Sequence, residues 1–435
     1  MSKNYLYSFL MILCLLLTNS FSVTGQIIES GDSSFIKRSN EDYISLEKDT
    51  IAGSDLLMEH PKSYLVRRPL FISAKYSGGK LLVSPDKLKS CYTQYTEIKV
   101  GFSSLGNRWK DIVYGMPYYG IGVGFYDFNS KQSGHPISAY LVQGGTLKAF
   151  SDKSILEYEW NFGSSFNWKT YDPVTNPNNL VIGAKANIYF AANLFYIHAL
   201  SKELDLNTGI TFNHVSNGAT HMPNAGVNTI SAFVGLTYHF DRERVKNIYN
   251  PLLRAPVYEN SRLISDYSVY ATVRQRKFPK EETGLSSKFV DQNFFVAGFS
   301  YALLHMPDYE YRYGGGIDLV YDESAGYKIK KIGERPDGSD ITESNYGKTC
   351  GRFGLGLSAR GDVVMPKYTV TGQIGYEVIK GKKQDSPFYQ IFSVRVPLWN
   401  GVYTSFVLRI QKFSKAQYMF LGIGYTFDHK PFKIR

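Results

Sequence analysis

The 435-residue chain has little cysteine, tryptophan, proline or charge. It contains 3 Cys, 4 Trp and 17 Pro, and only 20% of its residues are charged. So few cysteines exclude a disulfide-dense scaffold, because such scaffolds hold a short chain together with several bridges. The low proline content and the ample apolar residues exclude a disordered or collagen-like chain. With 43% hydrophobic residues, the chain has enough apolar material for one large domain or two ordinary ones.

After its N-terminus the sequence also lacks an uninterrupted apolar run. The nearest candidate, residues 180–200, is broken by Lys185, Asn187, Asn193 and His198, and the mean hydropathy is −0.23. A helix needs about 20 consecutive, mainly apolar residues to cross a bilayer. These two observations argue against a helical membrane protein.

Tyrosine, phenylalanine and glycine are abundant instead (34 Tyr, 28 Phe and 39 Gly), and this composition favours β-structure. The net charge is +11, which suggests nucleic-acid binding as one hypothesis. However, the basic residues are spread along the chain, the densest cluster is only Lys380, Lys382 and Lys383, and no recognition motif is visible. We therefore expect no nucleic-acid partner and interpret the charge as attraction to an anionic membrane surface, such as lipopolysaccharide phosphates.

Residues 1–25 are typical of a secretory signal peptide. Lys3 supplies the positive start, residues 9–17 (FLMILCLLL) form a short apolar core, and residues 23–25 (VTG) offer a small-residue cleavage site. An uncleaved anchor is the alternative. A secreted chain with no second spanning helix is periplasmic, extracellular or an outer-membrane β-barrel.

Cleavage would leave a polar N-terminal extension over residues 26–68. It would also leave two cysteines, Cys91 and Cys350. One disulfide between them is possible in an oxidising compartment, but two cysteines define no framework.

From Pro69 onward, segments of about ten residues alternate in polarity between turn residues, as transmembrane strands do. The clearest are 118–128, 137–150, 156–166, 203–215, 230–240, 267–276, 293–304, 311–321, 351–360, 368–378, 388–397, 402–411 and 418–427. In the segment 203–216 the even positions are mostly apolar (Leu204, Leu206, Ile210, Phe212) and the odd positions polar (Asp205, Asn207, Thr211, Asn213). A polar face that recurs in strand after strand needs a wet interior, which favours a membrane barrel over a soluble sandwich.

We predict an all-β fold, an antiparallel transmembrane β-barrel of roughly 12–16 strands in the outer membrane of a Gram-negative-type envelope. A single barrel is preferred over two small ones because the connecting segment 241–264 is short. Residues 69–240 would form one half and residues 265–435 would complete the barrel. The charged segment 328–348 fits an external loop.

The residues that suggest chemistry lie between Phe212 and Asn228. His214 and Ser216 are two apart on a strand, so both project from its lipid-facing side near the strand end. A histidine beside a serine can act as general base for a serine nucleophile, here toward a lipid ester. Asn228 shares this face on the next strand, where its amide oxygen could orient the imidazole. The plainer alternative is a polar strand end that turns into a loop.

Other candidate motifs are weaker. Glycine runs such as residues 120–124 lack the spacing of a phosphate-binding loop and fit strands that avoid crowding on one face. A metal site is not favoured at the acidic residues Asp318, Asp322 and Glu323, because no histidine lies at ligand spacing from them. They are more typical of charged residues at a strand end or in a loop. We expect neither a metal nor a cofactor.

The stretch His214-Val-Ser216-Asn217-Gly218, followed by Pro223-Asn224-Ala-Gly226, resembles the active-site signature of the outer-membrane lipid A 3-O-deacylases (PagL type, acyloxyacyl hydrolases). The resemblance covers about residues 115–240. It implies an eight-stranded barrel with a Ser-His-acid triad at its lipid-facing rim, which removes the ester-linked 3-hydroxyacyl chain from lipid A.

The resemblance also implies roles for individual residues. Ser216 would be the nucleophile and His214 its base, while Asn224 and the backbone amides near Asn217 and Gly218 would stabilise the oxyanion. The chain departs from the family pattern at Asn228, where a glutamate is usual, and in its length, which leaves residues 265–427 unexplained. A non-enzymatic porin, transporter or surface barrel with a vestigial His-Ser pair stays open as an alternative. The oligomeric state is left open.

Overall fold

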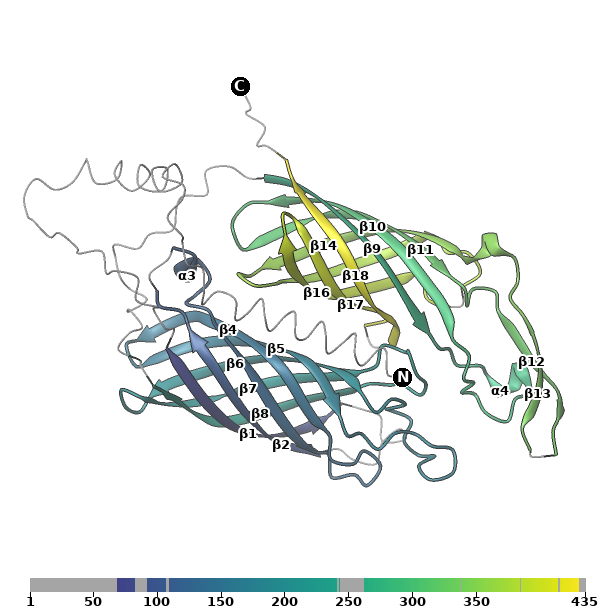
Figure 1. Cartoon of the computed structure of the whole chain (residues 1–435), viewed down its shortest axis with the longest axis horizontal. Helices are drawn as coiled ribbons and strands as arrows, with labels where there is room; N and C mark the ends of the chain where they lie inside the picture. The colour runs from purple at the N-terminus through teal and green to yellow at the C-terminus, as the bar shows by residue number, and fades with distance from the viewer. Residues whose placement is uncertain are drawn as a thin grey trace, which may run out of the picture. The chain divides into compact units, whose positions relative to one another are not determined.

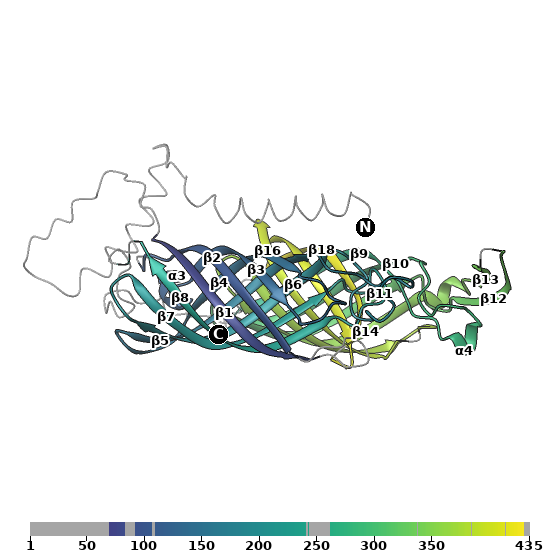
Figure 2. The ribbon, with the colours of Figure 1, turned by 90° about the horizontal axis from the view of Figure 1, so that it is seen from below.

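The computed structural model describes residues 69–82, 92–106, 109–240, 242, 262–336, 338–383, 385–413 and 415–429. These residues form two closed antiparallel barrels of eight strands each (Figures 1 and 2). The predicted signal peptide, the N-terminal extension, Cys91 and most of the connecting segment lie outside the described residues. Among the described residues, no helix has the length and hydrophobicity to cross a membrane.

The first barrel contains residues 70–239. Its strands are β1 (Leu70–Leu81), β2 (Tyr92–Ser103), β3 (Tyr118–Asp127), β4 (Ile137–Ser151), β5 (Ser154–Phe166), β6 (Asn187–Ala199), β7 (Leu204–Ser216) and β8 (Val227–His239), and a short helix, α3 (Trp109–Val113), lies between β2 and β3. Consecutive strands pair, and β8 returns to pair with β1, for example Leu236 with Ala74.

The second barrel contains residues 262–428. Its strands are β9 (Arg262–Arg274), β10 (Phe294–Met306), β11 (Tyr311–Asp322), β14 (Phe353–Val364), β15 (Thr369–Ile379), β16 (Phe388–Trp399), β17 (Val402–Gln411) and β18 (Lys415–Asp428). The connections add α4 (Lys280–Thr283), the hairpin of β12 (Lys328–Glu334) and β13 (Asp340–Asn345), and the 3-10 helix η3 (Thr349–Arg352). Strand β18 pairs with β9 and closes this barrel. The predicted external segment 328–348 therefore contains a two-stranded hairpin of its own.

The prediction of an all-β antiparallel barrel is confirmed, but the prediction of one barrel of roughly 12–16 strands is wrong. Because β1 pairs with both β2 and β8, the first half has no free edge on which β9 could add. Closure removes unpaired strand edges, and eight strands are enough to close around a core of side chains. Each half therefore satisfies its own backbone hydrogen bonds.

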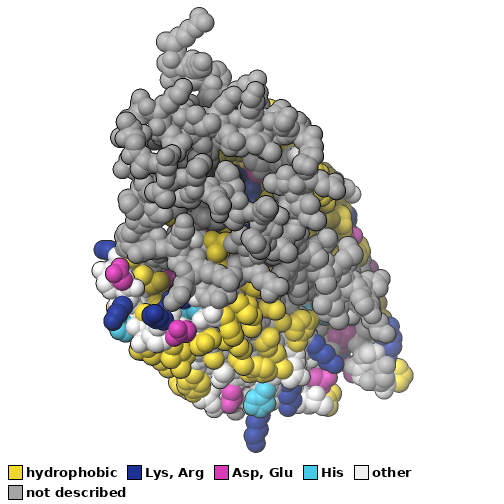
Figure 3. Space-filling model, turned by 60° about the vertical axis from the view of Figure 1, so that its left-hand side comes forward, with side chains coloured by type: hydrophobic (Ala, Val, Ile, Leu, Met, Phe, Trp, Pro, Cys, Tyr) yellow, Lys and Arg dark blue, Asp and Glu magenta, His cyan; other side chains and the backbone are white. Residues whose placement is uncertain are grey.

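Both barrels direct apolar side chains outward. On the first barrel these exposed residues include Ile72, Ile98, Ile121, Val123, Ile210 and Ile230, and on the second Val269, Phe299, Ile317, Leu357, Ile374 and Ile423. Figure 3 shows hydrophobic side chains gathered in a continuous area of the visible surface. An outward apolar band is the property that lets a barrel face lipid.

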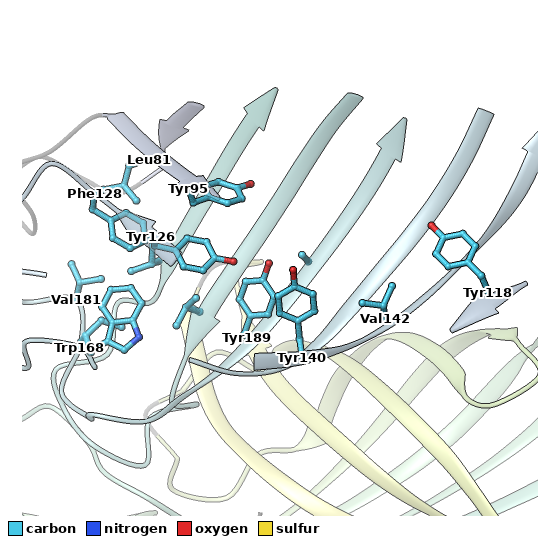
Figure 4. Close-up of a cluster of buried hydrophobic side chains, with 14 of the residues drawn as sticks. Leu81, Tyr95, Tyr118, Tyr126, Phe128, Tyr140, Val142, Trp168, Val181 and Tyr189 are labelled. Carbon is cyan, nitrogen blue, oxygen red and sulfur yellow. The ribbon is translucent and has the colours of Figure 1, made fainter. Parts of the chain in front are cut away.

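Tyrosines and ion pairs fill the lumen of the first barrel. Tyr126, Tyr140 and Tyr189 point toward one another from β3, β4 and β6 (Figure 4). The Nζ of Lys75 lies 2.7 Å from the carboxylate of Glu97. The alternating glycines of β3 make room for these rings, since a Cβ on Gly122 would lie 2.4 Å from the Tyr140 ring.

A buried carboxylate organises part of the lumen of the second barrel. Asp266 on β9 accepts hydrogen bonds from Arg360 at 2.8 Å, Arg395 at 3.0 Å and Tyr403 at 2.8 Å. The side chain of Arg360 also binds Asp362. Each buried charge here has opposite charges as neighbours, which offsets much of the cost of removing it from water.

Candidate active site

The predicted pair of histidine and asparagine meets at one end of the first barrel. His214 is opposite Asn228 in the ladder of β7 and β8. The Nδ1 of His214 lies 2.6 Å from the Oδ1 of Asn228. An antiparallel partner residue directly opposite has its Cβ only about 5 Å away, so the register of two neighbouring strands is sufficient to create this contact.

Alternation along β7 places His214 on the outer side of the barrel. Phe212 and Ile210, at the same parity, are 38% and 54% exposed, whereas Asn213 and Thr211 are buried in the lumen. The predicted parity of the strand is therefore correct. By this parity His214 and Ser216 lie on the same side of the strand as Ile210 and Phe212, but His214 is only half-buried and Ser216 is 3% exposed beneath the loop that follows the strand.

The hydroxyl of Ser216 lies among polar groups of the loop that connects β7 and β8. Its Oγ accepts hydrogen bonds from the backbone N–H of Gly218 and from the Nδ2 of Asn224, both at 3.0 Å. The backbone N–H of Asn217 donates to the Oδ1 of Asn224 at 3.3 Å. The three residues predicted to stabilise an oxyanion, Asn217, Gly218 and Asn224, thus gather around Ser216.

His214 and Ser216 border the same glycine. A Cβ on Gly226 would lie 3.5 Å from the Cε1 of His214 and 3.7 Å from the Cβ of Ser216. Among the described residues, the Nε2 of His214 has no hydrogen-bond partner, and Ser216 uses other partners. Catalytic hydrogen bonds are often long or misaligned without substrate, so this geometry is compatible with a serine–histidine pair.

The connecting loop needs backbone freedom at two glycines. Gly218 has φ +59° and Gly226 has φ +73°, both in the left-handed region that glycine enters without strain. Gly218 follows Asn217 directly, and Asn-Gly is a common turn sequence. The two turns fold the loop back so that Asn224 reaches Ser216.

The described residues contain no group of three or more histidine, cysteine, aspartate or glutamate side chains arranged to hold a metal ion. Asp318, singled out in the sequence, accepts hydrogen bonds from Ser300, Gln373 and Tyr389 inside the second barrel. Asp322 pairs with Arg274. Both carboxylates thus serve the polar interior of this barrel.

The loop between β5 and β6 also borders the site, through residues that the sequence did not assign to it. Its residue Ile182 forms an isolated β-bridge with Asn224. The carbonyl of Val181 accepts the backbone N–H of Ala225 at 3.1 Å. These are backbone contacts, so no residue type marks them in the sequence.

Comparison with known proteins gives two family matches along the chain. Residues 94–237 match the model described as lipid A 3-O-deacylase (PagL), and residues 266–430 match the model described as acyloxyacyl hydrolase, C-terminal domain. The two matches follow the two barrels. A search of curated proteins gave no match.

The solved structures to which this chain is similar have low sequence identity and low TM-scores. Neisserial surface protein A (NspA) is 12% identical, with 39% of this chain and 97% of that chain covered and a TM-score of 0.27. The siderophore receptor PirA from Pseudomonas aeruginosa is 8% identical, with 83% of this chain and 81% of that chain covered and a TM-score of 0.24.

Proposed function

Because the chain belongs to the lipid A 3-O-deacylase (PagL) family of the outer membrane, we propose that it is a lipid ester hydrolase. Its substrate would be lipid A or a related glycolipid, and its reaction the removal of an ester-linked acyl chain. Ser216 and His214 would carry out this reaction at the lipid-facing rim of the first barrel, after cleavage of a signal peptide.

The observation that carries the proposal is the contact between His214 and Asn228. We infer that the Nδ1 of His214 carries the proton, because the carboxamide oxygen that faces it can only accept a hydrogen bond. The Nε2 is then an acceptor, and it has no partner among the described residues. An imidazole held in this tautomer beside a serine is the arrangement required of a general base.

The proposed reaction proceeds in two steps. The Oγ of Ser216 attacks the ester carbonyl while its proton passes to the Nε2 of His214. The C–O bond to the sugar then breaks, and the proton moves to the departing sugar oxygen. Water hydrolyses the acyl-serine with the same histidine as base, which releases the fatty acid and regenerates the hydroxyl.

Polar groups around Ser216 support stabilisation of the intermediate. The N–H of Gly218 and the amide of Asn224 already contact the Oγ. Donors at such positions can bind the negative oxygen of a tetrahedral intermediate, and one donor contributes on the order of 10²–10³-fold in kcat. We assign this role to Asn224 and to the backbone amides of Asn217 and Gly218.

The lipid-facing position suits a substrate that resides in the membrane. An acyl chain attached at Ser216 could follow the outer apolar row of β7 and β8, which includes Phe212 and Ile230. The net charge of +11 would favour the phosphorylated headgroup of such a lipid. A pore function has less support, because ion pairs and tyrosines occupy the lumen of the first barrel and an ionic network occupies the second.

The test is the purified full-length protein in detergent, incubated with lipid A and analysed by mass spectrometry. The proposal expects release of one fatty acid by the wild-type protein and its loss in Ser216→Ala. Thr208→Ala, on the same face of β7 but away from the loop, should retain activity. Absence of release from every ester-acylated lipid tested would refute the enzyme proposal.

A further inference from the structure

A buried asparagine outside the proposed catalytic residues connects the loops at the site end of the first barrel. Asn179 lies in the loop between β5 and β6 and is 1% exposed. Its Nδ2 donates to the carbonyl of Gln132, in the loop between β3 and β4, at 3.1 Å and to the carbonyl of Lys169 at 2.7 Å. The amide thus fixes its own loop to a neighbouring loop.

The other side of the same amide fixes the segment that follows it. The Oδ1 of Asn179 accepts the backbone N–H groups of Val181 at 3.1 Å and Ile182 at 3.2 Å. All four hydrogen bonds of this side chain therefore go to backbone groups. A buried amide with every group satisfied holds its surroundings in one arrangement, and losing its partners would leave buried polar groups unpaired.

Residues 181–183, called here the strap, lie directly on the loop that carries the proposed site. The carbonyl of Val181 accepts the N–H groups of Ala225 at 3.1 Å and Gly226 at 3.4 Å. A Cβ on Gly183 would lie 2.8 Å from the carbonyl oxygen of Pro223. The strap and the site loop are therefore in contact along several residues.

Apolar side chains hold the strap from the lumen side. Val181 and Ile182 are 0% and 1% exposed and belong to the same buried cluster as Phe128 and Trp168. The rings of Phe128 and Trp168 stack with centroids 5.3 Å apart, and Figure 4 shows both beside Val181. The strap is thus fixed by packing on one side and by Asn179 through its backbone.

The contacts that begin at Asn179 continue through the strap to the residues around Ser216 and His214. Asn224, bridged to Ile182, contacts the Oγ of Ser216. Gly226, bound to Val181, borders His214. We propose that Asn179 is a positioning residue that sets the site loop relative to Ser216 and His214 through the strap. This inference rests on the proposed hydrolase function.

The test compares Asn179→Asp and Asn179→Ala with Asn178→Ala in the full-length protein. Asn179→Asp keeps the shape and the acceptor oxygen but places an oxygen opposite the carbonyls of Gln132 and Lys169. Asn178 is exposed, so its variant serves as the matched control. Two quantities are measured: kcat and KM on lipid A, and the rate at which a fluorophosphonate probe labels Ser216.

Both Asn179 variants are expected to lose about 10–10²-fold in kcat, since small displacements of reacting groups cost this much. KM should change less than about threefold, and labelling should slow by a factor similar to that of kcat. Asn178→Ala should match the wild type. Heat-modifiable mobility in gels, together with circular dichroism, verifies that each variant is folded.

Three outcomes would overturn the positioning role. The first is wild-type kcat and labelling in a folded Asn179→Asp protein, and the second is an effect on KM alone. The third is loss of the folded barrel in both variants, which would assign Asn179 to stability. A wild-type protein that hydrolyses lipid A while the Asn179 variants behave normally refutes only this inference. A wild-type protein that neither hydrolyses lipid A nor reacts with the probe refutes the proposed function.

Discussion

The imidazole of His214 faces the carboxamide of Asn228 across the ladder of β7 and β8, with 2.6 Å between Nδ1 and Oδ1. The two residues are 14 positions apart in the chain and come together because β7 and β8 are neighbouring antiparallel strands in which they lie directly opposite each other. A carboxamide fixes the tautomer and the ring orientation of the histidine. Unlike a carboxylate, it brings no negative charge to stabilise an imidazolium.

Replacing Asn228 tests whether this contact matters for the reaction. We expect Asn228→Ala to lower kcat by about 10²-fold with little change in KM, because the general base loses its orientation. Asn228→Asp keeps an acceptor and adds the missing charge, so its kcat should equal or exceed that of the wild type. Rates come from mass spectrometry of the released fatty acid, with the distant lipid-facing variant Leu236→Ala as control. Wild-type kcat in Asn228→Ala would contradict the proposed role.

Ser216 and His214 should behave as one unit. Ser216→Ala and His214→Ala are each expected to lower kcat by roughly 10³-fold or more, and the double variant should be no slower than either single one. The reason is that a general base has no function once its nucleophile is gone. The measurement is a double-mutant cycle on kcat/KM. Additive losses would show that the two residues act independently.

Alternating polarity predicted the orientation of β7 correctly, but it did not reveal every strand. Strand β6 falls within the apolar stretch 180–200, and its lumen side carries Tyr189, Ala191, Phe195 and Ile197. Because β6 has apolar residues on both faces, its sequence does not show the alternation of polar and apolar residues that marks the other strands. Strands β1 and β2 are likewise not among the clearest alternating segments of the sequence. The single barrel is expected because the connecting segment is short, and the pairing of β1 with β8 overturns that expectation.

The number of barrels depends on a different kind of information. Period two defines which face of a strand is apolar but not which strand is its neighbour. The pairing of β1 with β8 joins residues about 160 positions apart, such as Ala74 and Leu236. The contacts of the strap could not be predicted from the sequence either. Ala225 and Gly226 bind the backbone carbonyl of Val181, and a backbone contact does not depend on the residue type.

The buried carboxylate of Asp266 should stabilise the second barrel strongly. Asp266→Ala leaves the guanidinium groups of Arg360 and Arg395 without a shared partner, and breaking such a buried pair costs about 3–5 kcal/mol. Asp428→Ala is the matched control, because the pair of Asp428 and Arg262 is about half exposed and should contribute less than about 1 kcal/mol. Urea unfolding measures both free energies. Equal effects of the two substitutions would contradict this account.

The hairpin of β12 and β13, outside the two barrels, should loosen in acid. Asp340 lies 2.7 Å from the Nζ of Lys331 and accepts the N–H and the hydroxyl of Ser286 at 2.8 and 2.6 Å. These contacts, that of Lys331 first, lower the pKa of Asp340 from 3.8 to about 2.

A folded-state pKa below the unfolded one means that the carboxylate stabilises the folded hairpin above about pH 3.8, and that this contribution disappears as the pH falls toward 2. Hydrogen exchange of the amides in residues 328–345, corrected for intrinsic rates, should therefore lose protection between pH 4 and pH 2. In Asp340→Asn the protection should be lower at pH 4 and should change less between pH 4 and pH 2 than in the wild type, because the carboxylate at position 340 is gone. Protection that is the same at pH 4 and pH 2 in the wild-type protein would show that Asp340 does not hold the hairpin.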